Sequence, residues 1–406
     1  MTGPLKHVRV LDLSRIMAGP WASQLLADLG ADVIKVERPG AGDDTRSWGP
    51  PFLPDANGAQ SAESAYFLTV NRGKRSITVS LDKPEGQQII RDLAADVDVV
   101  LENYKAGTLS RYGLDYDSLK AINPKLVFCS VTGFGQSGPR RDQAAYDFMI
   151  QAMGGLMSVT GERDDQPGGG PQKVGVPIVD IMTGMYSAVA ILAALVKRDA
   201  TGVGENIDIA MLDVQIAMLA NQAMNYLISN KVPQRNGNSH PNIQPQDVFA
   251  CRDGDLAVVV GNDKQFLTFC QTLGLTELAT DERFVKNSGR VRQLDLLRPI
   301  ILQRLKEKDR RDWVALLDAA GIPASPINSI AEAFEDPQVQ HRKMLISMVH
   351  PLTGTLPQVA SPMRFKESPI QYQRHPPMLG QHNDEVLRSL QLSDAQIEGL
   401  KKAGII

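Results

Sequence analysis

The first 135 residues alternate between short β-branched apolar runs and amphipathic stretches, and this alternation restricts the possible folds more than any other feature. The runs that predict strands are Val8–Ser14, Asp32–Arg38, Ser76–Leu81, Val97–Glu102 and Lys125–Val131. Between them, Pro20–Asp28 and Pro84–Ala95 have the spacing of helices. Strands that follow one another through helices form parallel βαβ units. We therefore expect an α/β fold with a doubly wound parallel sheet.

Ligands of doubly wound sheets bind beyond the carboxyl ends of the strands. The segments at those ends are Arg15–Gly19, Glu37-Arg38, Glu102–Tyr104 and Thr132-Gly133. Basic residues lie at or near the same ends, and they fit either a solvated surface or a shared pocket for phosphate groups. They are Arg38, Lys74, Arg75, Arg111, Arg140 and Arg141.

Asp180 is the most informative carboxylate, because it lies in the largely apolar run Val176–Met182. Aspartate is rarely buried unless it is paired or functional. Its position at the start of a predicted helix fits an ordinary N-cap. It also fits a reactive carboxylate, which the helix dipole and backbone N–H groups would keep ionised. Trp21 and Trp48 each fit a core aromatic or a surface that stacks on a ligand.

Gly133–Gly138 matches the GxGxxG pattern of dinucleotide-binding proteins, but its context does not. Pro139-Arg140-Arg141 follows it, so we expect no helix N-terminus to receive a pyrophosphate. The segment also follows the fifth predicted strand rather than the first. Ser137 lies in Gly-Gln-Ser-Gly rather than in GxSxG, which disfavours a nucleophile elbow.

Charge and cysteine content exclude other classes of protein. The formal net charge is −3, so the chain lacks the basic footprint of a nucleic-acid-binding protein. Three scattered cysteines form no CxxC pair, and the six histidines show no metal-ligand spacing. No secretory signal is visible at Met1–Val8, and the apolar stretch Val176–Val196 contains Asp180, which favours a buried helix over a membrane span. We expect a protein of the cytoplasm, or of the mitochondrial matrix in a eukaryote, that binds neither nucleic acid nor a membrane.

The second half of the chain changes character after Lys231. Gly204–Met211 predicts one more strand and Leu212–Ser229 one more helix, and Val232–Gln246 is then rich in Pro, Asn, Gly and Gln, as linkers are. A predicted hairpin at Val248–Val260 and several helices follow. We expect a large domain from 1–228 and 324–406 around a small α+β domain at 229–323.

Several motifs together resemble class III CoA-transferases of the CaiB/BaiF, or formyl-CoA transferase, type. The motifs run in order along nearly the whole chain, which makes the resemblance specific. They are Val10–Pro20, Leu29–Pro39, Gly42–Pro51, Asn71–Ser76, Glu102-Asn103, Arg111–Gly113, Gly133–Pro139, Tyr146-Asp147, Gly237–Pro241 and Leu379–His382.

This resemblance implies a Rossmann-like large domain built from both chain ends, a small central domain, and a homodimer of two interlocked subunits. It implies no metal and no tightly bound cofactor, with CoA and acyl-CoA as substrates beside a free carboxylic acid. The nucleophile of the family falls on Asp180. The positions that contact CoA fall on Met17, Ala18, Arg38, Asn103, Tyr104, Arg111, Tyr146 and Asp147.

The family chemistry explains the need for a carboxylate. Asp180 would attack a donor thioester to form a mixed anhydride, and the released CoA thiolate would convert it into an aspartyl-CoA thioester. An acceptor carboxylate would then reverse these steps. The related α-methylacyl-CoA racemases use a histidine base where this chain has Tyr146, and a neutral phenol is a poor base near pH 7.

Within the family, the chain most resembles the succinyl-CoA:glutarate CoA-transferases. Formyl-CoA transferases typically have Gln at the position of Met17 and a glycine run where this chain reads Asn238–Pro245, so oxalate and formate are disfavoured. Carnitine and mesaconyl substrates are further alternatives. A dicarboxylate needs a second cation for its distal carboxylate, and we expect Arg15 or Arg46 to supply it, with Trp48 nearby.

Overall fold

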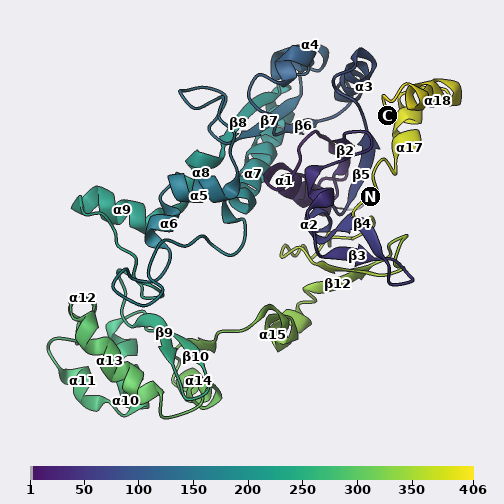
Figure 1. Cartoon of the computed structure of the whole chain (residues 1–406). Coiled ribbons are helices and arrows are strands. Elements are labelled where there is room, and N and C mark those ends of the chain that lie inside the picture. Colours follow the sequence, from purple (N-terminus) through teal and green to yellow (C-terminus); the bar gives the residue numbers. More distant parts are fainter. Residues whose placement is uncertain (1–2) are drawn as a thin grey trace. The chain divides into compact units, whose positions relative to one another are not determined.

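The structure is a computed structural model that describes residues 3–406; residues 1 and 2 of the N-terminal segment discussed above lie outside the described residues. Its centre is a six-stranded parallel sheet in the order β5-β2-β1-β6-β7-β8 (Figure 1). The strands are β1 (Arg9–Asp12), β2 (Asp32–Glu37), β5 (Lys74–Thr78), β6 (Val99–Glu102), β7 (Val127–Thr132) and β8 (Glu205–Ala210). The predicted α/β class and parallel sheet are therefore confirmed.

Helices cover both faces of this sheet. One face packs against α1 (Ala18–Asp28) and α7 (Ile178–Thr201) through small and branched side chains. The other packs against α3 (Pro84–Ala94), α4 (Tyr116–Ile122) and the C-terminal helices α17 (Asn383–Ser389) and α18 (Asp394–Lys402). The segment after α18 is tied to the loop that follows β5, because the Ser80 N–H donates to the Ile405 carbonyl at 2.8 Å.

A glycine on α7 allows α1 and α7 to approach closely. A Cβ atom on Gly184 would lie 2.7 Å from the Ala18 carbonyl oxygen and 2.9 Å from the Trp21 Cβ, closer than real Cβ contacts come. Residues four apart share one face of a helix. Asp180 precedes Gly184 by four positions, so this contact turns Asp180 towards the beginning of α1.

Two predicted helices are interrupted. Tyr146–Met157 divides into α5 (Asp147–Met153) and α6 (Leu156–Val159), because Gly155 adopts φ +84° between them. Leu212–Ser229 divides into α8 (Met211–Met218) and α9 (Ala220–Ser229), where Ala220 adopts φ +45°. After the GxGxxG segment, the next helix begins only at Asp147, as expected.

The chain forms two compact units, each described by itself. Among the described residues, unit 1 comprises 3–154, 174–220 and 338–406, and unit 2 comprises 155–173 and 221–337. Besides the elements above, unit 1 contains a hairpin of β3 and β4, the helix α2, and a hairpin of β12 and β13. Their bounds are β3 (Phe52–Pro54), β4 (Gln60–Ser64), α2 (Ala65–Thr69), β12 (Leu345–Met348) and β13 (Leu356–Val359), with short 3₁₀ turns η1 (Asp44–Ser47) and η2 (Leu109–Tyr112).

Unit 2 is built around a three-stranded antiparallel sheet in the order β11-β10-β9. Its helices enclose the fully buried Trp313, whose indole N–H donates to the Leu305 carbonyl at 2.8 Å. The elements are β9 (Gln246–Ala250), β10 (Asp255–Val259), α10 (Asp263–Leu273), α11 (Thr276–Thr280), α12 (Asn287–Arg292), α13 (Leu294–Leu305), α14 (Arg310–Ala319), β11 (Ala324–Pro326) and α15 (Ile330–Glu335); α16 (Pro337–His341) follows where the chain returns to unit 1.

By length and composition α7 could cross a membrane, and it is the one helix among residues 3–406 that meets this test. Half of its most apolar window is nevertheless buried inside the protein, where it packs on the sheet. This placement fits the predicted core helix.

Candidate active site

A cavity of about 300 Å³ opens at the carboxyl end of the sheet, where the strand order reverses between β1 and β6. Doubly wound proteins bind their ligands at this point, because the loops after the two central strands lead in opposite directions. Seven of the site residues predicted from the sequence line the cavity: Arg15, Met17, Ala18, Asn103, Tyr104, Tyr146 and Asp180.

The loops after β1 and β6 are joined by a side-chain amide. Asn103 Oδ1 accepts the Arg15 N–H at 2.9 Å, and Asn103 Nδ2 donates to the Arg15 carbonyl at 2.7 Å. One amide thus satisfies both polar groups of the same residue, which holds the loop of Met17 and Ala18 against the end of β6. This contact gives Asn103 a positioning role in addition to its place in the cavity wall.

Asp180 is the third residue of α7, but it does not cap that helix. The start of α7 is capped by Asp147 of α5, whose Oδ1 accepts the N–H groups of Val179 at 2.8 Å and Asp180 at 3.3 Å. Gln151 donates to the other oxygen of Asp147 at 2.6 Å. The structure therefore disfavours the ordinary N-cap interpretation of Asp180 and assigns that role to Asp147.

Burial, followed by the negative charge of Asp147, raises the pKa of Asp180 to about 7. Its exposed fraction is 9%, and within residues 3–406 neither a cation nor a hydrogen-bond donor acts on its carboxylate. We expected the helix start to keep Asp180 ionised, and that expectation is wrong. Asp147 accepts the N–H groups of Val179 and Asp180 in the first turn, and burial removes the water that would stabilise the charge.

Tyr66 of α2 contacts Trp48 and is influenced by the charge of Asp180. Burial and the charges of Asp180 and Asp147 raise the pKa of Tyr66 to about 12, so its phenol stays protonated. The Tyr66 ring meets Trp48 edge-on, with centroids 5.1 Å apart. Trp48 is 38% exposed, and this partial exposure suits an aromatic surface at the edge of a site better than a core position.

Arg15 and Arg38 share one carboxylate at the rim. The two oxygens of Asp44 accept from Arg15 Nη1 at 2.8 Å and from Arg38 Nη2 at 3.0 Å. The Arg15 side chain is half-buried and the Arg38 side chain is exposed. Each therefore keeps N–H donors directed to solvent, which a ligand anion can bind.

Arg46 and Arg111 lie elsewhere. Arg46 is buried, and its guanidinium bonds Glu37 at 2.8 Å and Glu63 at 3.0 Å. Because two carboxylates and the Pro377 carbonyl occupy its donors, Arg46 has little capacity for a substrate. Arg111 is exposed on η2 and does not line the cavity.

The sequence analysis did not single out Lys105 or Tyr66. Lys105 lines the cavity directly after Asn103-Tyr104, so its place after a strand end could have identified it. Tyr66 lies on α2, after a hairpin that the sequence pattern did not predict. Arg141, one of the basic residues considered for an anion pocket, also lines the cavity.

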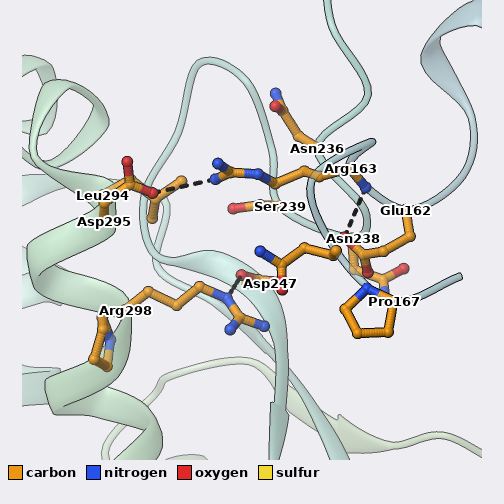
Figure 2. Close-up of a pocket in the computed structure, with 12 residues that line it drawn as sticks. Glu162, Arg163, Pro167, Asn236, Asn238, Ser239, Asp247, Leu294, Asp295 and Arg298 are labelled. Carbon is orange, nitrogen blue, oxygen red and sulfur yellow. Dashed lines mark hydrogen bonds and ion pairs between the residues drawn. The ribbon is translucent and has the colours of Figure 1, made fainter. Parts of the chain in front are cut away.

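A second cavity, of about 390 Å³, lies within unit 2 (Figure 2). Its two arginines are already paired, Arg163 with Asp295 at 3.1 Å and Arg298 with Asp247 at 2.7 Å. These ion pairs leave less capacity for an anion than the rim of the first cavity has. We therefore take the cavity with Asp180 as the candidate active site.

Comparison with known proteins identifies the protein family to which the chain belongs. The model of CoA-transferase family III matches residues 5–383. The chain is 49% identical over 388 residues to the succinate–glutarate CoA-transferase of Agrobacterium fabrum, covering 96% of each chain. It is 42% identical over 404 residues to the succinyl-CoA:glutarate CoA-transferase of Mus musculus, covering 99% of this chain and 90% of that one.

A solved structure agrees with these relatives. A CaiB/BaiF family protein from Brucella suis superposes with a TM-score of 0.83 at 47% identity, covering 96% of this chain and 100% of that one. The chain belongs to CoA-transferase family III, and it is an enzyme of that family.

We predict that Asp180 titrates with a midpoint near pH 7. The titration can be measured by ¹³C NMR of carboxyl-labelled aspartate, and the Asp180→Asn variant assigns the signal. Asp147→Asn should lower the midpoint, because it removes a negative neighbour while its amide oxygen still accepts the Val179 N–H. Asp92→Asn, the same change at an exposed position on α3, is the control and should leave the midpoint unchanged. A wild-type midpoint near 4 would contradict the prediction.

Proposed function

We propose that the protein transfers CoA from succinyl-CoA to glutarate, with Asp180 as the nucleophile. One observation carries the proposal: a buried carboxylate without a cationic partner faces a cavity at the strand-order reversal. A structural carboxylate would gain stability from a cation, whereas a nucleophile keeps its lone pairs free. The named activities of the Agrobacterium and mouse relatives support this donor and acceptor.

The reaction begins with the ionised form of Asp180. Its oxygen attacks the thioester carbonyl of succinyl-CoA, the C–S bond breaks, and CoA leaves as the thiolate. The thiolate then attacks the aspartyl carbonyl of the mixed anhydride, and succinate leaves. The product is an aspartyl-CoA thioester, so the energy of the original thioester is retained.

Glutarate completes the cycle by the reverse steps. One of its carboxylates attacks the aspartyl-CoA carbonyl and displaces the thiolate, which attacks the glutaryl carbonyl of the new anhydride. Glutaryl-CoA forms and Asp180 regains its carboxylate. Water has to be kept from the anhydrides, and burial of Asp180 serves that purpose.

The remaining site residues have binding roles in this proposal. Met17, Ala18, Asn103, Tyr104 and Tyr146 form walls of the cavity for the acyl-CoA. The exposed Arg38 and Arg111 bind phosphates of CoA outside it. CoA acts as a substrate rather than as a resident cofactor. We place the reaction in the cytoplasm.

We expect purified enzyme with succinyl-CoA and glutarate to yield glutaryl-CoA and succinate, detected by mass spectrometry. Asp180→Asn should lower the rate by at least about 10³-fold, because covalent catalysis is lost, while CoA affinity changes little. Acetate, formate and oxalate serve as comparison acceptors. Transfer by Asp180→Asn within tenfold of wild type would refute the nucleophile. Deuterium uptake by a branched acyl-CoA without any transfer would indicate a racemase instead.

Arg15 is the cation that we propose for the distal carboxylate of the dicarboxylate. It lines the cavity, and the one ion pair that it makes in the described structure uses only Nη1. Arg15→Ala should raise KM for glutarate by about 10- to 100-fold, since a hydrogen bond to a charged group is lost, with a smaller effect on butyrate. Arg38→Ala removes the other partner of Asp44. It should weaken succinyl-CoA binding without changing the ratio of the KM for glutarate to the KM for butyrate. An unchanged ratio in Arg15→Ala would refute the assignment.

We further propose that two copies form an interlocked homodimer. Large apolar side chains remain exposed on α5, α7 and α8, which pack on one another, and such patches mark interfaces. They are Phe148, Met149, Met153, Met185, Tyr186, Val189, Val196 and Ile216.

Sedimentation should give twice the mass of one chain, and dilution to nanomolar concentration should not change it. Interlocked chains cannot separate without unfolding, so differently tagged dimers should exchange subunits only after denaturant is added. A monomer mass, or exchange within minutes in buffer, would contradict this arrangement.

A further inference from the structure

Ile16 has a backbone conformation that its side chain disfavours. Its φ is +72°, in the left-handed region, and it lies between Arg15 and Met17 in the wall of the cavity. This conformation costs a non-glycine residue about 1–2 kcal/mol, and β-branched residues are genuine outliers there. Surrounding contacts have to maintain it.

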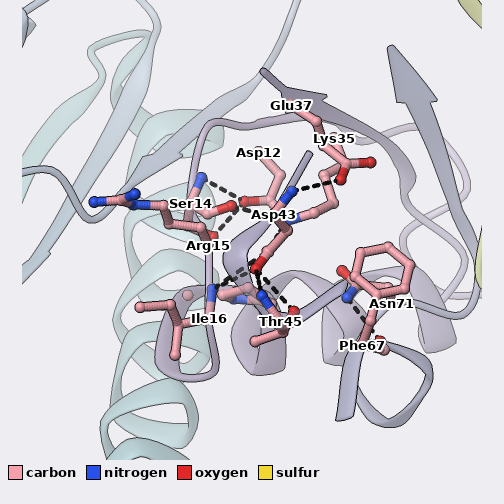
Figure 3. A network of polar contacts seen from close by, with 12 residues as sticks. Asp12, Ser14, Arg15, Ile16, Lys35, Glu37, Asp43, Thr45, Phe67 and Asn71 are labelled. Atoms are coloured by element: carbon pink, nitrogen blue, oxygen red, sulfur yellow. Dashed lines mark hydrogen bonds and ion pairs between the residues drawn. The ribbon is translucent and has the colours of Figure 1, made fainter. Parts of the chain in front are cut away.

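Asp43 supplies the central contact (Figure 3). Both of its carboxylate oxygens lie 3.2 Å from the Ile16 backbone nitrogen. The same carboxylate is oriented by Thr45, whose N–H and hydroxyl donate to Oδ1 at 3.0 and 2.8 Å. The backbone N–H of Asp43 in turn donates to Glu37 at 2.9 Å.

Lys35 of β2 anchors Asp43 and the turn together. Its ammonium donates to Asp43 at 2.8 Å and to the Ser14 carbonyl at 2.9 Å, and both ionic side chains are fully buried. Asn103 holds Arg15 from the other side. Three consecutive residues, Ser14, Arg15 and Ile16, are thus held by the side chains of Lys35, Asn103 and Asp43 in turn. Asp43 holds Ile16, the residue with the strained backbone.

We propose that Asp43 is a positioning residue for the CoA transfer, acting by holding Ile16 in its left-handed conformation. This inference rests on the proposed function. If Ile16 relaxed to negative φ, the peptide planes leading into Met17 and Ala18 would rotate, and the wall beside Asp180 would change shape. Displacements of about 1 Å at a reacting centre can cost 10²-fold in rate.

The test is a double-mutant cycle of Asp43→Asn and Ile16→Gly, because glycine adopts positive φ without strain. Asp43→Asn should lower kcat by about 100-fold and raise KM for succinyl-CoA by less than about fivefold. In the Ile16→Gly background the same substitution should lower kcat by only about tenfold, since the conformation no longer needs a clamp. Equal losses in both backgrounds would overturn the proposal.

Two further variants separate positioning from stability. Asp28→Asn breaks another buried ion pair, with Arg72 at 2.6 Å, outside the cavity; it should lower Tm while kcat stays within about twofold. Thr45→Val removes one hydrogen bond to Asp43 and keeps the volume of the side chain. If Asp43→Asn does not fold, this milder variant should still lower kcat. The loss of kcat should be smaller in the Ile16→Gly background. A loss of kcat in Asp28→Asn equal to that in Asp43→Asn would also overturn the proposal.

The wild-type enzyme in the same assay distinguishes the two proposals. Absence of wild-type transfer would refute the proposed function. Wild-type transfer together with additive effects of Asp43→Asn and Ile16→Gly would refute only the positioning role.

Discussion

Two buried lysines at the core of the sheet determine how the strand ends are arranged. Lys35 and Lys74 have fully buried side chains and pair with Asp43 and Asp12 at 2.8 and 3.1 Å. Burial lowers the pKa of Lys74 to about 8, although the charge of Asp12 acts in the opposite direction. Burying an ion costs several kcal/mol unless its partners are well placed, so neither the end of β1 with Asp12 nor the loop with Asp43 can move without a large penalty.

These ion pairs tie the segments beside the candidate site to the buried strands. Asp12 at the end of β1 also accepts from Ser14 and Ser23, and Lys35 bonds the Ser14 carbonyl. The carboxylates of Asp12 and Asp43 therefore have cationic partners, whereas that of Asp180 has none among the described residues. The fold uses its ion pairs to hold position and leaves the carboxylate beside the cavity unpaired, as covalent catalysis requires.

Much of this arrangement follows from local patterns in the chain. The β-branched apolar runs predicted all five N-terminal strands of the sheet, and the strand ends indicated Arg15, Asn103 and Tyr104 before any relative was considered. For Arg46, the same reasoning did not predict the partners of the side chain. Its guanidinium was considered for a substrate carboxylate, but Glu37 and Glu63 occupy it, and neither pairing can be read from spacing along the chain.

The sequence by itself determined the α/β class, the order of strands and helices, and the suspicion that Asp180 is reactive, because apolar periodicity and an isolated carboxylate are local properties. Only the tertiary structure decided which residue caps α7, which arginines keep free donors, and the raised pKa of Asp180. These properties depend on burial and on charges from distant segments, such as Asp147 beside Asp180 and Asp43 beside Ile16. Electrostatic energies vary with distance and solvent access in space, and neither quantity exists until the chain has folded.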